Sequence, residues 1–388
     1  MVPEDYLRSA RRVDEWLSKH EFSAYDPFDG LNAWVRPLAS GRLARQVLQQ
    51  AVRRAPINLR PWLAIQPSAS SKAMGYLARA YLKLERCEPG GEFVDRARFA
   101  LQWLLDNSSV GFSGLAWGNH FDYQSRVFYL PEGEPTVVWT SLVGHAFLDA
   151  WDQLREPRWL SAARSIRTFI VEDLERRECG AGLCISYIPS GFYAVHNANM
   201  LASGFLAREA LCSGDDGVLD ICRRAVDYTV GCQHPDGSWW YGEAHDRHWI
   251  DSFHTGYVID SLWWYMLGSG DVRHAGAFVK GADFYAANFF RCDGLPKYYA
   301  QRTWPVDIQC AAQGVETLSL LANALDGRLL NLAEQVATWT IDHMQGADGH
   351  FAYQVWPGVT NRTAMIHWGQ ATMIHALSCL ALGTEGTP

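Results

Sequence analysis

The sequence lacks the features that mark nucleic-acid-binding and membrane proteins. Its 388 residues carry 34 Lys and Arg against 42 Asp and Glu, a net charge of −8, and no basic run interrupts this acidic balance. Because a domain that grips nucleic acid by its phosphates needs a basic face, we expect no nucleic-acid partner. The longest uncharged stretch, residues 179–207, is broken by polar residues. We therefore expect no transmembrane segment.

Signals for export and for disulfide bonding are also missing. The first 19 residues hold many charged side chains where a signal peptide needs an apolar stretch. The 9 cysteines are scattered without the paired spacing of a disulfide framework or a zinc knuckle. These two patterns favour reduced thiols in a cytoplasmic protein. Nothing in the sequence indicates an oligomeric state.

Several catalytic motifs are absent as well. The chain has no glycine-rich phosphate loop, no dinucleotide fingerprint and no nucleophile elbow around a Ser or Cys. It has no His-Glu-x-x-His pair, and Asp251, His254 and His196 do not have the spacing of a familiar zinc ligand set. We therefore expect no cofactor and no metal.

What the sequence does have is a repeat of helix pairs. At 48% hydrophobic residues it can bury a large core. Six similar segments open with small and polar residues and then turn apolar at helical spacing; they span residues 68–84, 137–153, 196–211, 252–267, 308–325 and 365–381. The later ones start every 56 to 59 residues, which is the length of two helices with their loops.

A second set of segments lies between the first and is more amphipathic. These segments span residues 4–19, 92–106, 158–175, 218–232, 272–290 and 329–344. A helix with one apolar stripe belongs on the outside of a helical layer, whereas one that is apolar all round belongs inside. The two sets predict an all-α (α/α)6 toroid. We expect one domain over residues 1–388, with an N-terminal helix and cap segment in 1–60 and the repeat core in 60–385.

The connections that precede the inner segments are long, and those that follow are short. In a toroid the long connections meet on one rim, where a rigid scaffold usually carries its site. Polar residues gather at these helix starts, so we expect them to converge on a central cavity. The expected catalytic residues are Asp122, His196, Asp251, His254 and Asp307.

Each of these residues also has a purely structural interpretation. A single His or Asn at a helix start is more often a cap or a buried hydrogen-bonding group, and Asp251 and Asp307 stand where N-caps would stand. Glu243 is a further acid/base candidate.

Aromatic and cationic residues complete the predicted site. With 17 Trp, 16 Tyr and 17 Phe, many in the loops, the chain offers flat faces for stacking on sugar rings. Arginines in the same loops would suit an anionic substrate. The expected substrate-binding residues are Trp117, His120, Tyr123, Asn197, Asn199, Trp240, Trp249, Arg302, Trp304, His367, Trp368 and Gln370.

Two turns, DGSWWYGE at 236–243 and DGHFAY at 348–353, resemble those of the α/α-toroid superfamily. That superfamily includes six-hairpin glycosidases, uronate lyases and epimerases, and terpenoid cyclases. The segments at 249–262, 305–321 and 365–378 resemble an uncharacterised bacterial family found with polysaccharide-biosynthesis genes, and Gly-Gln-Ala at 369–371 is similar to glucuronyl C5-epimerases. The chain departs from class II terpenoid cyclases because it has no Asp-x-Asp-Asp motif.

The resemblance implies a carbohydrate-active enzyme acting on an oligo- or polysaccharide, with a uronate-containing, anionic one favoured. Two carboxylates would serve a glycoside hydrolase. A His or Tyr that removes the proton α to a uronate carboxylate would serve a lyase or C5-epimerase. A terpenoid-cyclase-like enzyme and a non-catalytic glycan-binding protein stay open as alternatives. An aliphatic cavity would favour the cyclase, and a cavity with no carboxylate near a His would favour the binder.

Overall fold

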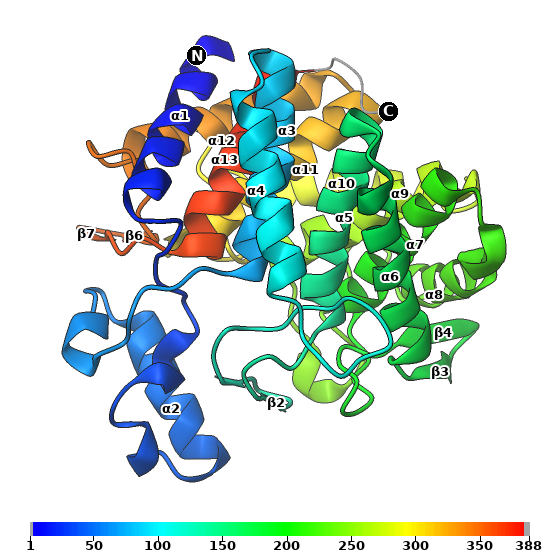
Figure 1. Ribbon diagram of the computed structural model, residues 1–388, viewed down its shortest axis with the longest axis horizontal. Coiled ribbons are helices and arrows are strands. Elements are labelled where there is room, and N and C mark those ends of the chain that lie inside the picture. The colour runs from blue at the N-terminus through cyan, green and yellow to red at the C-terminus, as the bar shows by residue number, and fades with distance from the viewer. Residues whose placement is uncertain (1–2, 384–388) are drawn as a thin grey trace.

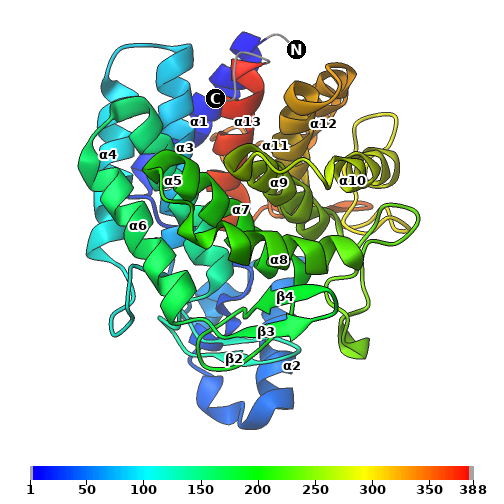
Figure 2. The ribbon, with the colours of Figure 1, turned by 90° about the vertical axis from the view of Figure 1, so that its right-hand side faces the viewer.

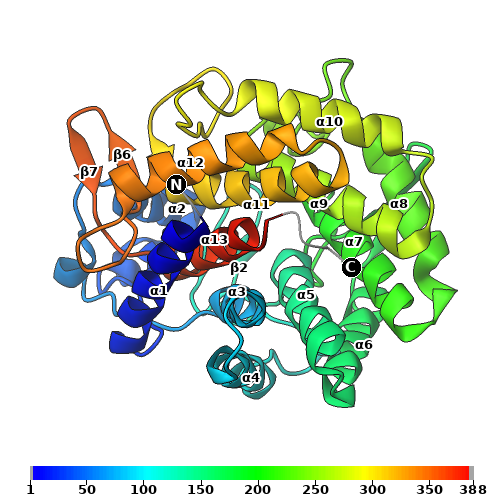
Figure 3. The ribbon, with the colours of Figure 1, turned by 90° about the horizontal axis from the view of Figure 1, so that it is seen from above.

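Two concentric rings of helices make up the computed structural model, which describes residues 3–383 (Figure 3). The inner ring consists of α3 (Ser71–Cys87), α5 (Val137–Leu154), α7 (His196–Ser213), α9 (Ser252–Ser269), α11 (Ile308–Ala324) and α13 (Thr372–Leu382). The outer ring consists of α1 (Pro3–Lys19), α4 (Glu92–Asp106), α6 (Pro157–Glu172), α8 (Leu219–Gly231), α10 (Ala275–Asn288) and α12 (Arg328–Met344).

Each inner helix packs against the next, and the ring closes where α13 meets α3. The first helix of the chain, α1, packs on α13 and so completes the sixth pair. This architecture confirms the predicted (α/α)6 toroid. No helix among residues 3–383 is long and apolar enough to cross a membrane.

The two helix types differ in burial as the sequence predicts. In α7 every residue from His196 to Ala210 is buried, whereas α4 buries only a stripe that begins at Ala97 and ends at Leu104. Inner helices also approach closely, since a Cβ on Gly144 of α5 would lie 2.4 Å from the ring of Phe205. A small residue is therefore needed at that crossing.

The last inner helix departs from the prediction at its start. Residues Ile366–Ala371 form a π-helical turn before α13 begins, and the amide of Gln370 donates to the carbonyl of Met365. A π-turn widens the helix locally, and such turns often occur at functional sites. It places His367 and Trp368 at the same end of the ring as the other inner-helix starts.

The loops contain short antiparallel strands. They are β1 (Tyr123–Gln124) with β2 (Tyr129–Leu130), β3 (Arg176–Cys179) with β4 (Gly182–Ile185), and β5 (Val306–Asp307) with β6 (Gln354–Trp356) and β7 (Val359–Asn361). The strands β2, β3 and β4 lie at the end of the toroid opposite the first turn of α1 and the last turn of α13 (Figures 1 and 2). The long connections thus gather on one rim.

An additional helix, α2 (Gly41–Arg54), lies at the same end (Figure 1). The segment that carries it is closed at its base by a buried ion pair, in which Nε of Arg60 lies 2.8 Å from both carboxylate oxygens of Asp29. The same guanidinium donates to the carbonyl of Asp26 at 2.6 Å. These bonds tie the two ends of residues 26–60 to each other.

Candidate active site

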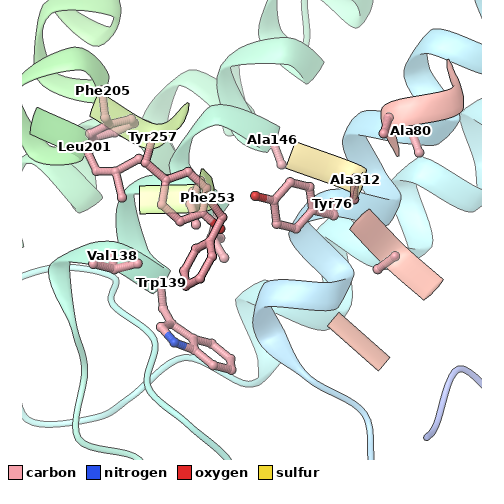
Figure 4. Close-up of a cluster of buried hydrophobic side chains, with 14 of the residues drawn as sticks. Tyr76, Ala80, Val138, Trp139, Ala146, Leu201, Phe205, Phe253, Tyr257 and Ala312 are labelled. Carbon is pink, nitrogen blue, oxygen red and sulfur yellow. The ribbon is translucent and has the colours of Figure 1, made fainter. Parts of the chain in front are cut away.

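A cavity of about 980 Å³ lies among the starts of the inner helices, the long loops and α2. Its wall is largely aromatic and includes Phe28, Tyr123, Trp139, Tyr187, Trp240, Tyr241, Trp249, Phe253, Tyr257, Tyr298, Tyr299, Trp356 and Trp368. Figure 4 shows Trp139, Phe253 and Tyr257, which belong both to this wall and to the hydrophobic cluster inside the ring. Such walls suit flat, C–H-rich ligands.

Asp251 performs two tasks at the start of α9. Its Oδ1 caps the helix by accepting from the amide of His254 at 3.0 Å. Its Oδ2 lies 2.7 Å from Nδ1 of His254 and accepts from the indole of Trp249 at 3.1 Å. A carboxylate only accepts, so it fixes the proton of His254 on Nδ1 and leaves the lone pair on Nε2. Among the described residues no hydrogen bond reaches Nε2.

A second His–Asp pair faces the same cavity. Nδ1 of His367, in the π-turn before α13, lies 2.6 Å from Oδ2 of Asp26, and both side chains are buried. Burial lowers the pKa of His367, although the carboxylate opposes this effect. Burial also acts to raise the pKa of Asp26, but the attraction of His367 and His120 prevails and lowers it. The carboxylate therefore remains ionised beside His367.

The other charged side chains of the cavity are cationic. Among residues 3–383 the lining holds two carboxylates, Asp26 and Asp251, and each lies beside a histidine. The cations that line the cavity are Arg53, Arg54, Lys72, Arg126 and Arg302. The acidic protein thus presents a basic interior surface. Guanidinium and ammonium groups in such a site favour a carboxylate or another anion.

Lys72 is the most buried of the cations that line the cavity, and its surroundings lower its pKa. Its ammonium donates to the hydroxyl of Tyr257 at 3.2 Å and lies 6.0 Å from the ring of Trp368. Burial lowers the pKa of Lys72 to about 8. Its ammonium form can therefore release a proton, and its neutral amine can accept one, slightly above neutral pH.

Nine of the residues expected from the sequence do line the cavity. They are Tyr123, Asn197, Trp240, Trp249, Asp251, His254, Arg302, His367 and Trp368. They come from α7, α9, the π-turn and three separate loops, and the ring brings them together.

Three expected residues instead lie behind the wall and hold it in place. Asp307 caps α11 and accepts from the indole of Trp368 at 2.8 Å. Asn199 accepts from the amide of Ile185 and donates to two groups of α8. Gln370 bonds both backbone groups of Phe351. The expectation that these side chains line the cavity is corrected, because helix-start residues also point sideways into neighbouring segments.

The remaining expected residues also lie outside the cavity lining. Asp122 pairs with Arg36 at the surface, and the half-exposed Trp304 lies on the loop before β5. Trp117 is a core residue whose indole donates to the carbonyl of Leu104. His120 packs edge-on against Phe121, and burial lowers its pKa to about 4.

His196, at the first position of α7, is also displaced from the cavity. Its Nε2 lies 2.9 Å from Oε1 of Glu243, its Nδ1 lies 3.3 Å from the hydroxyl of Thr229, and its side chain is 1% exposed. Its neighbours Val195 and Asn197 line the cavity instead. The first residue of a helix and the next point about 100° apart, which separates His196 from Asn197.

Sequence reasoning missed Asp26, Arg53 and Lys72. Lys72 had a usable signal, because it follows two serines at the start of an inner helix, like the polar residues of the other helix starts. Asp26 and Arg53 had none, since the path of residues 20–65 across the rim depends on the buried Arg60–Asp29 pair.

Comparison with solved structures finds the same fold in several proteins. A sugar epimerase from a ruminal bacterium aligns with a TM-score of 0.64 and 12% identity over 84% of this chain and 91% of its own. Cellobiose 2-epimerase from Bacillus thermoamylovorans aligns with a TM-score of 0.62 and 12% identity over 82% and 89%. A polysaccharide lyase aligns with a TM-score of 0.61 and 8% identity over 98% and 97%.

The fold is that of an α/α toroid. At these identities the likeness speaks for the fold alone. No family model and no curated protein matches the sequence.

Proposed function

We propose that this chain is an enzyme that transfers protons on an anionic sugar, as a C5-epimerase or a lyase acting on uronate residues of an oligo- or polysaccharide. The observation that carries this proposal is the pair of His–Asp contacts, His254–Asp251 and His367–Asp26, on one cavity. Among residues 3–383 the other charged side chains that line this cavity are cations. A proton α to a carboxylate needs a base to remove it and a cation to stabilise the enolate.

His254 is the proposed base. Asp251 holds the proton on Nδ1, so Nε2 takes the proton from the carbon α to the uronate carboxylate. The electron pair left on that carbon moves into the carboxyl group, which becomes an enolate, and Lys72 and Arg302 are the cations of the lining proposed to stabilise it. His367, held by Asp26, is the proposed second acid/base group.

The enolate has two outcomes, and they define the two candidate reactions. In an epimerase a proton returns to the same carbon from the other face, and the sugar changes configuration. In a lyase the C4–O bond breaks with its electron pair, a C4–C5 double bond forms, and the leaving oxygen takes up a proton. Both reactions use the same base and the same cations.

The wall supports a carbohydrate as the ligand. Trp139, Trp240, Trp249 and Trp368 offer indole faces, and Asn197 offers an amide within the same cavity. Aromatic rings stack on sugar C–H faces while polar groups fix the hydroxyls. Solved structures of similar fold include a sugar epimerase, a polysaccharide lyase and an α-mannanase from Bacteroides thetaiotaomicron, which agrees with this ligand class.

The alternatives fit the cavity less well. A glycoside hydrolase needs a carboxylic acid and a second free carboxylate, whereas Asp26 and Asp251 each lie beside a histidine. A terpenoid cyclase would need a cavity free of this cationic surface. A pure binder would not need His254 within 2.7 Å of a carboxylate.

The test is a panel of uronate-containing and neutral polysaccharides incubated with the protein in D2O. We expect deuterium uptake or an unsaturated product from uronate substrates alone, and loss of both with His254→Gln. His343→Gln is the matched control, since His343 lies on outer helix α12 and bonds the carbonyl of Trp339. Reducing ends from neutral polysaccharides without deuterium uptake would indicate a hydrolase and overturn the proposal.

A further inference from the structure

A cluster of metal-ligating side chains lies behind the cavity wall, outside the proposed catalytic machinery. It consists of His196 at the start of α7, Cys232 directly after α8, and Glu243 in the loop that follows. One donor atom from each of the three lies within 4.8 Å of the other two. No motif in the sequence indicates this cluster, because its members come from three segments without a familiar ligand spacing.

We propose that His196, Cys232 and Glu243 form a binding site for a single zinc ion. Imidazole, thiolate and carboxylate are the three ligand types of protein zinc sites. With Zn–N and Zn–O bonds of about 2.0 to 2.1 Å and Zn–S of about 2.3 Å, tetrahedral donors stand roughly 3.3 to 3.8 Å apart. Nε2 of His196 and Oε1 of Glu243 are 2.9 Å apart, so modest side-chain rotations suffice.

The charges of the cluster also fit a divalent ion. A thiolate and a carboxylate together carry two negative charges, and His196 is neutral when its Nε2 binds a metal. The site with zinc is therefore uncharged, which limits the cost of its partly buried position. The side chain of Glu243 is 39% exposed, so an ion can enter from solvent, and water can take the fourth position.

The surroundings orient the imidazole as a metal ligand. Nδ1 of His196 lies 3.3 Å from the hydroxyl of Thr229, a buried residue that Asn199 holds with a 3.0 Å hydrogen bond. Metal-bound histidines usually donate their other ring N–H to such a fixed acceptor. Nε2 is then the nitrogen that faces the cluster.

The zinc would also join the segments that carry part of the cavity wall. The loop that carries Glu243 also carries Trp240, Tyr241 and Trp249, which line the cavity. The amide of His196 already donates to the carbonyl of Tyr241 at 3.0 Å. An ion shared by His196, Cys232 and Glu243 would tie this wall segment to α7 and α8.

Cobalt binding tests the proposal, because a Co²⁺–thiolate bond gives a near-ultraviolet charge-transfer band that other ligands do not. Tag-free full-length protein is freed of metal with EDTA and titrated with Co²⁺ and then Zn²⁺. We expect one equivalent of Co²⁺ to produce the band and one equivalent of Zn²⁺ to abolish it. The melting temperature should rise with zinc.

Variants assign the ligands. Cys232→Ser should remove the band, and Glu243→Gln, on an exposed side chain, should keep the band and weaken Co²⁺ affinity at least tenfold. Cys292→Ser is the matched control, because that thiol is exposed and lies outside the cluster. The proposal is overturned if no saturable one-equivalent binding occurs, if the band survives Cys232→Ser, or if Glu243→Gln binds Co²⁺ as tightly as the wild type.

Discussion

Replacing Asp251 with Asn separates its two tasks, the capping of α9 and the orientation of His254. The carboxylate accepts three bonds: from the amide of His254, from Nδ1 of His254 and from the indole of Trp249. Asn is about as good an N-cap as Asp, so the cap survives with the amide oxygen in the Oδ1 position. The NH2 group then faces two donors.

The consequences for stability and for rate differ in size. Because Trp249 is only partly buried, leaving its indole without an acceptor costs at most about 1–3 kcal/mol of unfolding free energy. His254 must move its proton to Nε2 to accept from the new NH2 group, and that proton blocks the atom proposed as the base. Loss of a positioned general base lowers a rate about 10²–10⁴-fold. The rate should thus fall far more than the loss of folded protein explains.

The assay measures proton exchange into uronate oligosaccharides together with urea unfolding of the same preparation. Asp307→Asn is the matched control, because Oδ1 of Asp307 caps α11 and accepts from the indole of Trp368, and no histidine of the described chain contacts this carboxylate. Its Oδ2 accepts from the buried side-chain amide of Gln354, and this is the bond that Asn would lose. We expect Asp307→Asn to lose about as much stability as Asp251→Asn and to lose much less of the rate. If Asp251→Asn retains more than a tenth of the wild-type rate, the reasoning about the His254 tautomer is wrong.

Three further predictions follow from the charges of the structure. Arg302→Met should raise KM for anionic substrates about 10- to 100-fold, because the substrate would lose one charge-assisted hydrogen bond. An unchanged KM in steady-state kinetics would exclude a contact between Arg302 and the substrate. Burial lowers the pKa of Lys72 from 10.5 to about 8, so between these pH values the unfolded chain binds more protons than the folded protein. The contribution of Lys72 to the free energy of unfolding therefore rises by about 3 kcal/mol as the pH increases from the lower to the higher of these values. Chemical unfolding at several pH values should show this rise in the difference between the unfolding free energies of the wild type and of Lys72→Met. A difference that does not change with pH would contradict the prediction. Arg60→Met leaves Asp29 buried without its partner and should cost about 3–5 kcal/mol of unfolding free energy. Limited proteolysis should then cut residues 20–65 first, and a loss below about 1 kcal/mol would show that the pair does not hold the two ends of this segment together.

The toroid was predictable because its two helix types leave different patterns. A helix such as α7, buried on all sides, must be apolar or small throughout, whereas α4 needs only one stripe. The strict alternation of these patterns at a constant spacing indicates pairs and then a ring. The pairing of β5 with β6 was not predictable, since this two-residue ladder depends on two distant loops meeting in space.

The lining of the cavity was predictable by region but only partly by residue. His254 and Asp251 are three positions apart on one helix start, so their contact follows from local geometry. His367 was identified, but its partner Asp26 was not, because that pair joins the two ends of the chain. His196 shows the converse error, since its position beside Asn197 on α7 gave no sign that its side chain points behind the wall.

The central claim is that His254 removes a proton from carbon. The most direct measurement is ¹H NMR of a uronate oligosaccharide in D2O with the wild type and with His254→Gln. The account predicts that the wild type exchanges the hydrogen α to the carboxylate for deuterium, or yields an unsaturated sugar, and that the variant does neither. Cleavage or turnover with that hydrogen fully retained, at equal rates in both proteins, would contradict it.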